Sequence, residues 1–380
     1  MSLGRPLWRS LEMVRSELRL ELTLACGQSF RWRETAEGHW TGVMGGRVWT
    51  LTQLDNKLWY YVYENQQDRI HRKWTEEESE PETKYIGDVK ADAQTYSEEE
   101  RLLKDYFQLN INLEELYKDW GERDTHFKKL ADTFSGVRML RQDPTECLFS
   151  FICTSNNHIS RIQGMVERLC LTLGIKLCQL DETSYHDFPS LSALAESNVE
   201  ACLRDLGFGY RAKFLQQSAK TILDSHGPHW LSGLRNVPYH EARDALRTLS
   251  GVGTKVADCV CLMSLDKTEA VPVDTHVWQI AKRDYKFISS HGQKTITDKL
   301  HRDIGDFFKN LWGPYAGWAQ SVLFCSDLKK FQNMTPVTKK LKREIKCEED
   351  TVKETVLSKI IKQENIKKKR PVSTKRQKHL

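Results

Sequence analysis

The sequence predicts an α+β protein with an N-terminal antiparallel β-sheet domain, an all-α domain and a disordered basic tail. Three observations lead to this prediction. Short runs with alternating apolar residues occupy residues 1–75, as is typical of half-buried strands. Capped segments with helical spacing of apolar residues fill residues 101–328. Residues 329–380 are rich in lysine and poor in aromatic residues, a composition that does not support a core.

Size and composition narrow the class of protein. A chain of 380 residues can bury a core and form two or three domains. We find no run long enough to span a membrane and no secretory signal, although the arginines before Glu12 are compatible with a mitochondrial leader. The ten cysteines form no CxxC pair, so we expect free thiols in a reducing compartment.

The charge is unevenly distributed. Residues 329–380 hold 17 Lys and Arg against 6 Asp and Glu, a balance of +11, whereas the rest of the chain has a balance of −6. The part predicted to fold is therefore not basic overall. Any nucleic-acid site in it must be a local patch or must use the dipoles of the backbone.

The first 75 residues contain the predicted strands in order. SELRLELTL (16–24) has leucine at every second position and predicts a strand. HWTGVM (39–44) and RVWTLTQ (47–53) flank Gly45-Gly46, which predicts a hairpin. LWYYVY (58–63) predicts a further strand.

Helix signals follow an acidic stretch. Residues 76–100 contain ten acidic residues and two lysines, which favours a solvated insertion or linker. Ser97 and Glu100 form a capping box that predicts a helix start. Asp143-Pro144 predicts another, with an N-cap and a proline in the first turn. Further helices are predicted in ECLFSFIC, ISRIQGMVERLCLTLG, EARDALRTL, THVWQIAKRDY and WAQSVLFCSDL.

One lysine is predicted near the N-terminus of an apolar helix. LSGVGTKVADC (249–259) predicts a Gly-x-Gly turn between two helices, and the glycines permit positive φ and close approach of another backbone. Turn N–H groups and a helix N-terminus together make an anion site suited to a phosphate. Lys255 itself has three interpretations: a solvated charge, a phosphate contact or a nucleophile. Burial would leave its amine uncharged more readily, which favours the nucleophile.

A carboxylate follows 19 residues later. In AVPVDTHVWQI, Asp274 stands directly before a helical run and is a natural N-cap whose helix N–H groups would keep it ionised. An isolated aspartate at such a position usually does nothing more. Paired with the Gly-x-Gly turn and Lys255, it is predicted to be the partner of the nucleophile.

At this point the motifs resemble a known family. The Gly-x-Gly turn, Lys255 and Pro272-Val273-Asp274 are similar to the helix-hairpin-helix/Gly-Pro-Asp superfamily of base-excision DNA glycosylases. GQSFRW, CLFSFICTSNNHISRI, GFGYRAKF and WGPYAGWAQSVLF further resemble the eukaryotic 8-oxoguanine DNA glycosylase/AP lyase, over residues 10–328. The resemblance implies a TBP-like sheet domain before a helical glycosylase domain, and excision of 8-oxoguanine opposite cytosine in base excision repair.

The resemblance also implies roles for residues. Lys255 would attack the sugar of the flipped nucleotide and form a Schiff base that leads to strand cleavage, while Asp274 would stabilise the positive charge. Five residues would bind the base: Gly27 through its carbonyl, Gln320 at the Watson–Crick edge, Cys259 and Phe324 as a sandwich, and Pro272 as lining. Asp327 would support the site without touching the base.

The remaining expected roles concern DNA. Asn156, Arg161 and Arg211 would read the orphaned cytosine while Tyr210 enters the base stack. Gly251, Gly253, His276 and, in a loop of looser resemblance, Gln293 would also contact DNA. We expect a monomer acting on double-stranded DNA that carries 8-oxoguanine paired with cytosine. No metal, iron–sulfur cluster or other cofactor is implied.

Two alternatives stay open. A glycosylase for another lesion, such as an alkylated base, would share the fold, but GQSFRW with Gln320 and Phe324 argues against it. A non-catalytic helix-hairpin-helix DNA-binding module would need no pair of Lys255 and Asp274. For location, KKKRPVSTKRQK (367–378) predicts a nuclear-localisation segment or a nucleic-acid arm, with a solubilising tail as the alternative.

Overall fold

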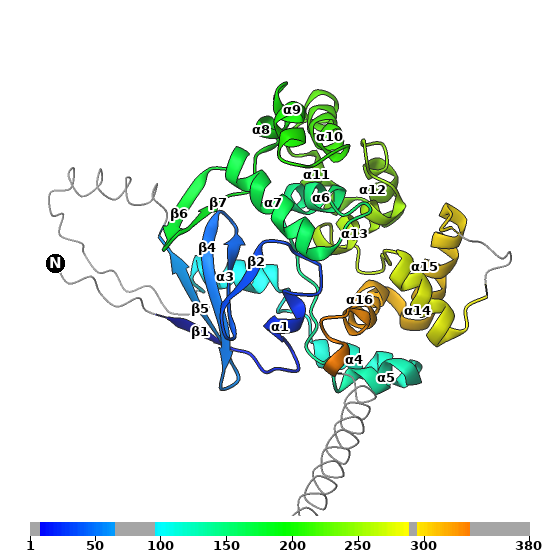
Figure 1. Cartoon of the computed structure of the whole chain (residues 1–380). Coiled ribbons are helices and arrows are strands. Elements are labelled where there is room, and N and C mark those ends of the chain that lie inside the picture. The colour runs from blue at the N-terminus through cyan, green and yellow to red at the C-terminus, as the bar shows by residue number, and fades with distance from the viewer. Residues whose placement is uncertain (1–7, 65–95, 289–294, 335–380) are drawn as a thin grey trace, which may run out of the picture. The chain divides into compact units, whose positions relative to one another are not determined.

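The structure is a computed structural model that describes residues 8–64, 96–288 and 295–334 (Figure 1). Contacts divide the chain into a unit of residues 1–327 and a second unit of residues 328–380. Three predictions fall outside the described residues: Gln293, most of the acidic stretch, and the tail beyond residue 334.

A five-stranded antiparallel sheet forms the N-terminal part, with the strand order β1-β5-β4-β3-β2. Its strands are β1 (Arg9–Glu12), β2 (Trp32–Ala36), β3 (His39–Met44), β4 (Arg47–Leu54) and β5 (Lys57–Tyr63). Gly45 and Gly46 connect β3 and β4 with φ of +57° and +67°, conformations that glycine adopts without strain. The predicted hairpin and the predicted strand at 58–63 are confirmed.

The predicted strand at 16–24 is wrong. These residues form turns and the short helix α1 (Leu20–Thr23). All four leucines, Leu18, Leu20, Leu22 and Leu24, are at most 2% exposed. Arg19, which lies between Leu18 and Leu20, is also held by a distant part of the chain. Its guanidinium donates a hydrogen bond to the Thr133 carbonyl at 2.8 Å. The segment buries its leucines in turns and a short helix and is held by contacts with distant residues, so the period of two does not report a strand.

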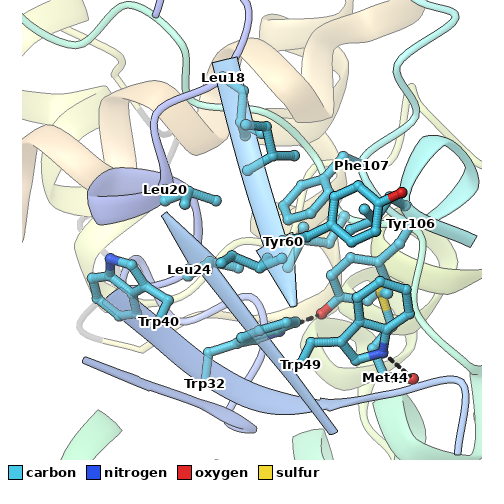
Figure 2. Close-up of a cluster of buried hydrophobic side chains, with 14 residues drawn as sticks. Leu18, Leu20, Leu24, Trp32, Trp40, Met44, Trp49, Tyr60, Tyr106 and Phe107 are labelled. Atoms are coloured by element: carbon cyan, nitrogen blue, oxygen red, sulfur yellow. Dashed lines mark hydrogen bonds between the residues drawn. The ribbon is translucent and has the colours of Figure 1, made fainter. Parts of the chain in front are cut away.

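The sheet packs directly on the first long helix, α3 (Glu98–Tyr106). Figure 2 shows Trp32, Trp49 and Tyr60 of the sheet with Tyr106 and Phe107 in one buried cluster. The Trp32 indole N–H donates to the Tyr106 hydroxyl at 2.9 Å, which satisfies two polar groups inside this cluster. The core of the sheet therefore continues into the helices that follow residue 96.

Helices make up most of the rest of the described chain. They are α4 (Leu113–Arg123), α5 (Thr125–Ala131), α6 (Pro144–Ile152), α7 (Ile159–Leu173), α8 (Leu191–Ala195), α9 (Val199–Asp205), α10 (Arg211–Ser225), α11 (Trp230–Gly233), η1 (Leu234–Asn236), α12 (Tyr239–Leu246), α13 (Thr254–Ser264), α14 (Thr275–Tyr285), α15 (Asp298–Trp312), η2 (Gly313–Tyr315), α16 (Ala316–Asp327) and, in the second unit, η3 (Gln332–Met334). Within the described residues, none of them has the length and apolar character of a membrane span.

The predicted helix starts at Ser97 and Asp143 are confirmed. The Ser97 hydroxyl accepts a hydrogen bond from the Glu100 N–H at 3.2 Å, and the Asp143 carboxylate accepts one from the Glu146 N–H at 2.9 Å. Each cap satisfies an N–H group that the first helical turn leaves unpaired.

The predicted sheet domain followed by a helical domain is confirmed, and the helical domain also contains a second, short β-hairpin that the sequence analysis did not predict. β6 (Lys176–Leu180) and β7 (Thr183–His186) pair antiparallel, with Asp181 at φ +48° in the turn. Leu177 and Cys178 pack against Val43 and Val48 of the large sheet. Figure 1 shows β6 and β7 beside that sheet. The hairpin is stable because it covers apolar residues of a domain far away in the sequence.

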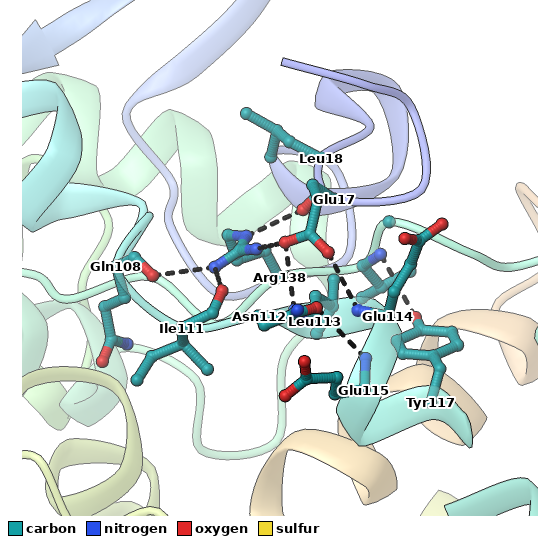
Figure 3. A network of polar contacts seen from close by, with 12 residues as sticks. Glu17, Leu18, Gln108, Ile111, Asn112, Leu113, Glu114, Glu115, Tyr117 and Arg138 are labelled. Carbon is teal, nitrogen blue, oxygen red and sulfur yellow. Dashed lines mark hydrogen bonds and ion pairs between the residues drawn. The ribbon is translucent and has the colours of Figure 1, made fainter. Parts of the chain in front are cut away.

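A buried arginine joins the N-terminal segment to α4 (Figure 3). The Arg138 side chain is 1% exposed and pairs with the Glu17 carboxylate. It also donates to the carbonyls of Glu17, Gln108 and Ile111 at 2.7–2.9 Å. The Glu17 carboxylate in turn accepts from the N–H groups of Leu113 and Glu114, at the start of α4. The guanidinium and the carboxylate therefore satisfy backbone hydrogen-bonding groups of three segments: the one at Glu17, the one at residues 108–111, and the start of α4.

Replacing Arg138 by methionine should destabilise the protein strongly. The change leaves the Glu17 carboxylate and three carbonyls without their buried partner, a loss of about 3–5 kcal/mol in the free energy of unfolding. Chemical denaturation measures it. Arg204→Met is the matched control, because Arg204 forms an exposed pair with Glu200 in α9 and should cost no more than about 1 kcal/mol. Equal losses in the two variants would contradict the role of the network.

Candidate active site

Two helices and a tight turn form the centre of the site. α12 and α13 are joined through Gly251, whose φ is +78° and where an added Cβ would lie 2.6 Å from the Phe214 ring. The positive φ expected of the turn is confirmed at this glycine. Gly253, the N-cap of α13, instead has φ −93°, which any residue can adopt. An added Cβ at Gly253 would meet no atom within 4 Å, so the space in front of it is open.

Lys255 lies in the first turn of α13. Its Nζ is 3.5 Å from the Thr154 hydroxyl and 5.1 Å from the centroid of the Phe151 ring. The residue is half-buried, whereas its neighbours along the helix are buried. One turn further, burial raises the pKa of Cys259 to about 11, and the nearby Lys255 opposes that rise. The Lys255 amine thus lies beside a hydroxyl and an aromatic ring, and the residue as a whole stays partly exposed.

Asp274 is the N-cap of α14, as predicted. Its Oδ1 accepts hydrogen bonds from the N–H groups of His276 at 2.9 Å and Val277 at 3.0 Å. These two bonds fix the orientation of the carboxylate and satisfy two N–H groups of the helix. The residue is half-buried, so the carboxylate is both fixed and reachable.

Lys255 and Asp274 lie where two hollows meet. The first is a cavity of about 50 Å³, and all five residues predicted to bind the base line it with Lys255 and Asp274. The second is a groove of about 610 Å³, whose walls include the predicted DNA contacts Asn156, Gly251, Gly253 and His276. Both Lys255 and Asp274 line the groove as well. The two side chains therefore stand between the larger groove and the smaller cavity.

Gly27 is fixed by the residue after it. The Gln28 side chain donates to the Arg138 carbonyl at 2.9 Å and accepts from the Leu140 N–H at 2.9 Å. The Gln142 amide donates to the Gln28 carbonyl at 2.9 Å. Gly27 itself has φ +82°, and an added Cβ would lie 3.2 Å from Ile159. The sequence did not reveal this support, because Arg138 and Gln142 are more than 100 positions away.

His276 contacts both Phe324 and Asp327 beside the cavity. The Phe324 ring meets the His276 ring edge-on, with centroids 5.8 Å apart. His276 Nδ1 is 3.2 Å from an Asp327 carboxylate oxygen, and Arg283 donates to the other oxygen at 2.9 Å. Asp327 therefore orients His276 and, through it, the ring of Phe324.

The residues predicted to read cytosine are not all exposed. Asn156 is exposed at φ +48°, and Arg161 is exposed in the first turn of α7. Arg211 is only 4% exposed, and its guanidinium donates to the carbonyls of Ser155 and Asn156. Tyr210 is 48% exposed, and its ring centroid lies 4.6 Å from the Arg211 guanidinium carbon. Here Arg211 shapes the loop that presents Asn156; contact with cytosine stays a prediction.

Sequence reasoning missed a buried polar cluster behind Lys255. Asp258 on α13 accepts a hydrogen bond from the Tyr239 hydroxyl at 2.7 Å and contacts His301 Nε2 at 2.6 Å. These contacts join α13 to α12 and α15, and they hold the helix that carries Lys255. The signal in the sequence was a single acidic residue in an otherwise apolar helix.

Family comparisons agree with this arrangement. The 8-oxoguanine DNA glycosylase N-terminal domain matches residues 10–148, and the HhH-GPD superfamily of base excision DNA repair proteins matches residues 149–304. An N-glycosylase/DNA lyase of Arabidopsis thaliana is 38% identical over 86% of this chain and 81% of its own length. An N-glycosylase/DNA lyase of Saccharomyces cerevisiae is 36% identical over 84% of this chain and 85% of its own length.

Solved structures show the same fold. The 8-oxoguanine glycosylase/lyase of Clostridium acetobutylicum without DNA is 26% identical, with a TM-score of 0.67 over 84% of this chain and 95% of that one. The same protein with double-stranded DNA containing cytosine opposite 8-oxoguanine gives a TM-score of 0.66 at 26% identity, over 84% of this chain and 96% of that one. Together with the site geometry, these matches place the chain in the 8-oxoguanine DNA glycosylase family of the HhH-GPD superfamily, as an N-glycosylase/DNA lyase of base excision repair.

Proposed function

We propose that the chain excises 8-oxoguanine paired with cytosine in double-stranded DNA and then nicks the strand through a Schiff base on Lys255. The observation that carries this proposal is the position of Lys255 and Asp274 where the groove meets the cavity. A duplex in the groove that flips one nucleotide into the cavity would leave the sugar of that nucleotide between the two side chains.

The first reaction step is a displacement at the sugar. The Lys255 amine attacks C1′, the bond from C1′ to the base nitrogen breaks, and the base leaves with the electron pair and takes up a proton. Positive charge develops on the sugar in this step. The Asp274 carboxylate, already oriented by two N–H groups, stabilises that charge.

The second step cleaves the strand. The amine on C1′ loses a proton, the sugar ring opens, and the nitrogen and C1′ form a Schiff base. Loss of a C2′ proton then expels the 3′ oxygen, which breaks the DNA backbone by β-elimination. Water finally releases the sugar from Lys255. This sequence needs an amine nucleophile, and water alone as nucleophile would not give it.

Base selection is assigned to the cavity. The Gly27 carbonyl accepts the hydrogen on N7 that 8-oxoguanine has and guanine lacks, while Gln320 binds the Watson–Crick edge. Cys259 and Phe324 enclose the base and Pro272 lines the cavity. A single backbone acceptor in an enclosed site should discriminate by about 2–4 kcal/mol at the chemical step.

The substrate assignment is tested with three duplexes that differ at one base pair. They carry 8-oxoguanine opposite cytosine, guanine opposite cytosine, and an alkylated adenine opposite thymine. We expect excision of 8-oxoguanine about 30- to 1,000-fold faster than guanine, from the energy difference above. Faster release of the alkylated base would support the alternative substrate. Tight binding of all duplexes without base release would support a binding module.

DNA binding on the opposite strand is assigned to the residues around the groove. Asn156, Arg161 and Arg211 contact the orphaned cytosine while Tyr210 fills the stack, and His276 contacts phosphate. The protein acts as a monomer in this proposal. Binding should weaken steeply as salt is raised, because phosphate contacts dominate such affinity.

Two glycine variants separate folding from DNA contact. Gly253→Ala should fold normally, because φ −93° suits alanine and its Cβ meets nothing in the protein. If a phosphate approaches Gly253, the added methyl should weaken DNA binding about tenfold, the equivalent of one hydrogen bond. Gly251→Ala should instead destabilise the fold by on the order of 1–3 kcal/mol, because of its positive φ and the Phe214 ring. Unchanged DNA affinity of Gly253→Ala would contradict a phosphate at this turn.

The cellular location is a proposal from the tail. The basic segment 367–378 would direct the protein to the nucleus, with a mitochondrial fraction directed by the N-terminus. Fluorescent fusions of the full chain, with and without the basic segment, test this. Nuclear accumulation that does not depend on the segment would contradict it.

A further inference from the structure

A buried glutamine connects two walls of the cavity. Gln142, two residues before the start of α6, is 3% exposed. Its side-chain amide donates to the Gln28 carbonyl at 2.9 Å, and its main-chain N–H donates to the Met263 carbonyl at 2.8 Å. Its own carbonyl accepts a hydrogen bond from Arg235 at 3.1 Å. Gln28 and Met263 both line the cavity, so Gln142 joins the segment that follows Gly27 to the helix α13.

The carbonyl proposed to recognise the base belongs to the residue type with the greatest conformational freedom. Gly27 has φ +82° and no Cβ, so its own backbone does little to fix the direction of its carbonyl. That carbonyl shares one peptide plane with the N–H of Gln28. The Gln28 side chain is bound to the backbone of Arg138 and Leu140, and Gln142 binds the Gln28 carbonyl. The hydrogen bonds of Gln28 therefore do most to set the direction of the Gly27 carbonyl.

Gln142 also relates this carbonyl to the nucleophile. Met263 lies in the last turn of α13, and Lys255 lies in the first turn of the same helix. The contact between Gln142 and Met263 is reinforced by Arg235, whose guanidinium donates to the carbonyls of Gln142 and Ser264. The base-recognising carbonyl and the nucleophilic amine are thus both positioned relative to one helix, the carbonyl through two glutamines in series.

We propose that Gln142 is a positioning residue for base selection, which keeps the Gly27 carbonyl aimed at N7 of the flipped base. This inference rests on the proposed function, in which that carbonyl accepts the N7 hydrogen of 8-oxoguanine. A hydrogen bond weakens steeply when its donor and acceptor are misaligned, so a fixed carbonyl gives 8-oxoguanine the full bond. Guanine has a bare acceptor at N7, and the same fixed carbonyl faces it without a hydrogen between them. A carbonyl free to turn would lose the first effect and relieve the second.

The test variant is Gln142→Met, which keeps the length of the side chain and removes its donor to the Gln28 carbonyl. Single-turnover rates are measured on one preparation with duplexes that carry 8-oxoguanine or guanine opposite cytosine. We expect excision of 8-oxoguanine to slow about tenfold, the equivalent of one hydrogen bond, while excision of guanine stays unchanged or rises. Cleavage of a preformed abasic duplex, which places no base in the cavity, should stay within about twofold of wild type.

Gln53→Met is the matched control. The Gln53 side chain also holds a backbone segment, since it donates to the Leu18 carbonyl at 2.8 Å and accepts from the Leu20 N–H at 2.9 Å. Those leucines belong to the buried cluster of the sheet. Thermal unfolding should show a loss of stability comparable to that of Gln142→Met, whereas the ratio of the 8-oxoguanine and guanine rates should equal that of wild type. A merely structural defect lowers both rates together and leaves their ratio unchanged.

A second variant guards against a failure of Gln142→Met to fold. Gln142→Asn keeps a polar amide that is one methylene too short to reach the Gln28 carbonyl, and its ratio of rates should fall in the same direction. A wild-type ratio in the Gln142 variants, or an equal fall of the ratio in Gln53→Met, overturns the inference and leaves the proposed function standing. If wild type itself shows no preference for 8-oxoguanine over guanine, the proposed function fails and the inference fails with it.

Discussion

Replacing Lys255 by glutamine should abolish both base excision and strand cleavage while DNA binding persists. Glutamine is polar and only one atom shorter than lysine, but it offers no nucleophilic amine, so a loss on the order of 10⁴-fold in excision rate is expected. Single-turnover kinetics on an 8-oxoguanine duplex measures the loss, and a gel-shift titration measures binding.

The matched control is Lys282→Gln on α14. Its Nζ lies 3.6 Å from the centroid of the Trp278 ring, away from both hollows, so excision should stay within about twofold of wild type. If Lys255→Gln kept the excision rate of wild type, the amine would be a phosphate contact or a solvated charge, the two interpretations that the sequence left open.

Replacing Asp274 by asparagine should separate the chemical role of this residue from its role as a cap. Asparagine is as good an N-cap as aspartate, so the free energy of unfolding should change little. Excision should nevertheless fall on the order of 10²–10³-fold, because the neutral amide cannot stabilise positive charge on the sugar. Thermal unfolding and single-turnover kinetics give the two measurements.

Asp274→Ala completes the comparison. Alanine removes both hydrogen bonds to the N–H groups of His276 and Val277, so it should cost about 1 kcal/mol of stability as well as activity. If Asp274→Asn were fully active and only Asp274→Ala were impaired, Asp274 would act as a cap alone.

Local signals predicted local structure well. Gly45-Gly46 predicted its hairpin, and Asp143 and Asp274 predicted their helix starts, because turns and caps depend on residues within a few positions. The strand predicted at 16–24 failed because distant groups enclose that segment. The hairpin of β6 and β7 was missed because its stability comes from packing on the large sheet.

The candidate site also contains residues that local signals predicted and residues that they did not. The Gly-x-Gly turn, Lys255 and Asp274 lie within 24 residues and were recognised from spacing and residue type. That Gly27 and Gln320 line one cavity, 293 positions apart in the chain, came only from the resemblance to a family. The hydrogen bonds that fix Gln28 and the burial of Arg211 could not be predicted, because they depend on which loops meet in the folded chain.

The most direct test of the central claim is chemical trapping. Wild type is incubated with an 8-oxoguanine:cytosine duplex and sodium borohydride, which reduces a Schiff base to a stable amine, and the adduct is digested and sequenced by mass spectrometry. We predict a sugar fragment on the Nζ of Lys255 and no adduct in Lys255→Gln. Base release without any adduct, or an adduct on a different lysine, would contradict the assignment of Lys255 as the nucleophile.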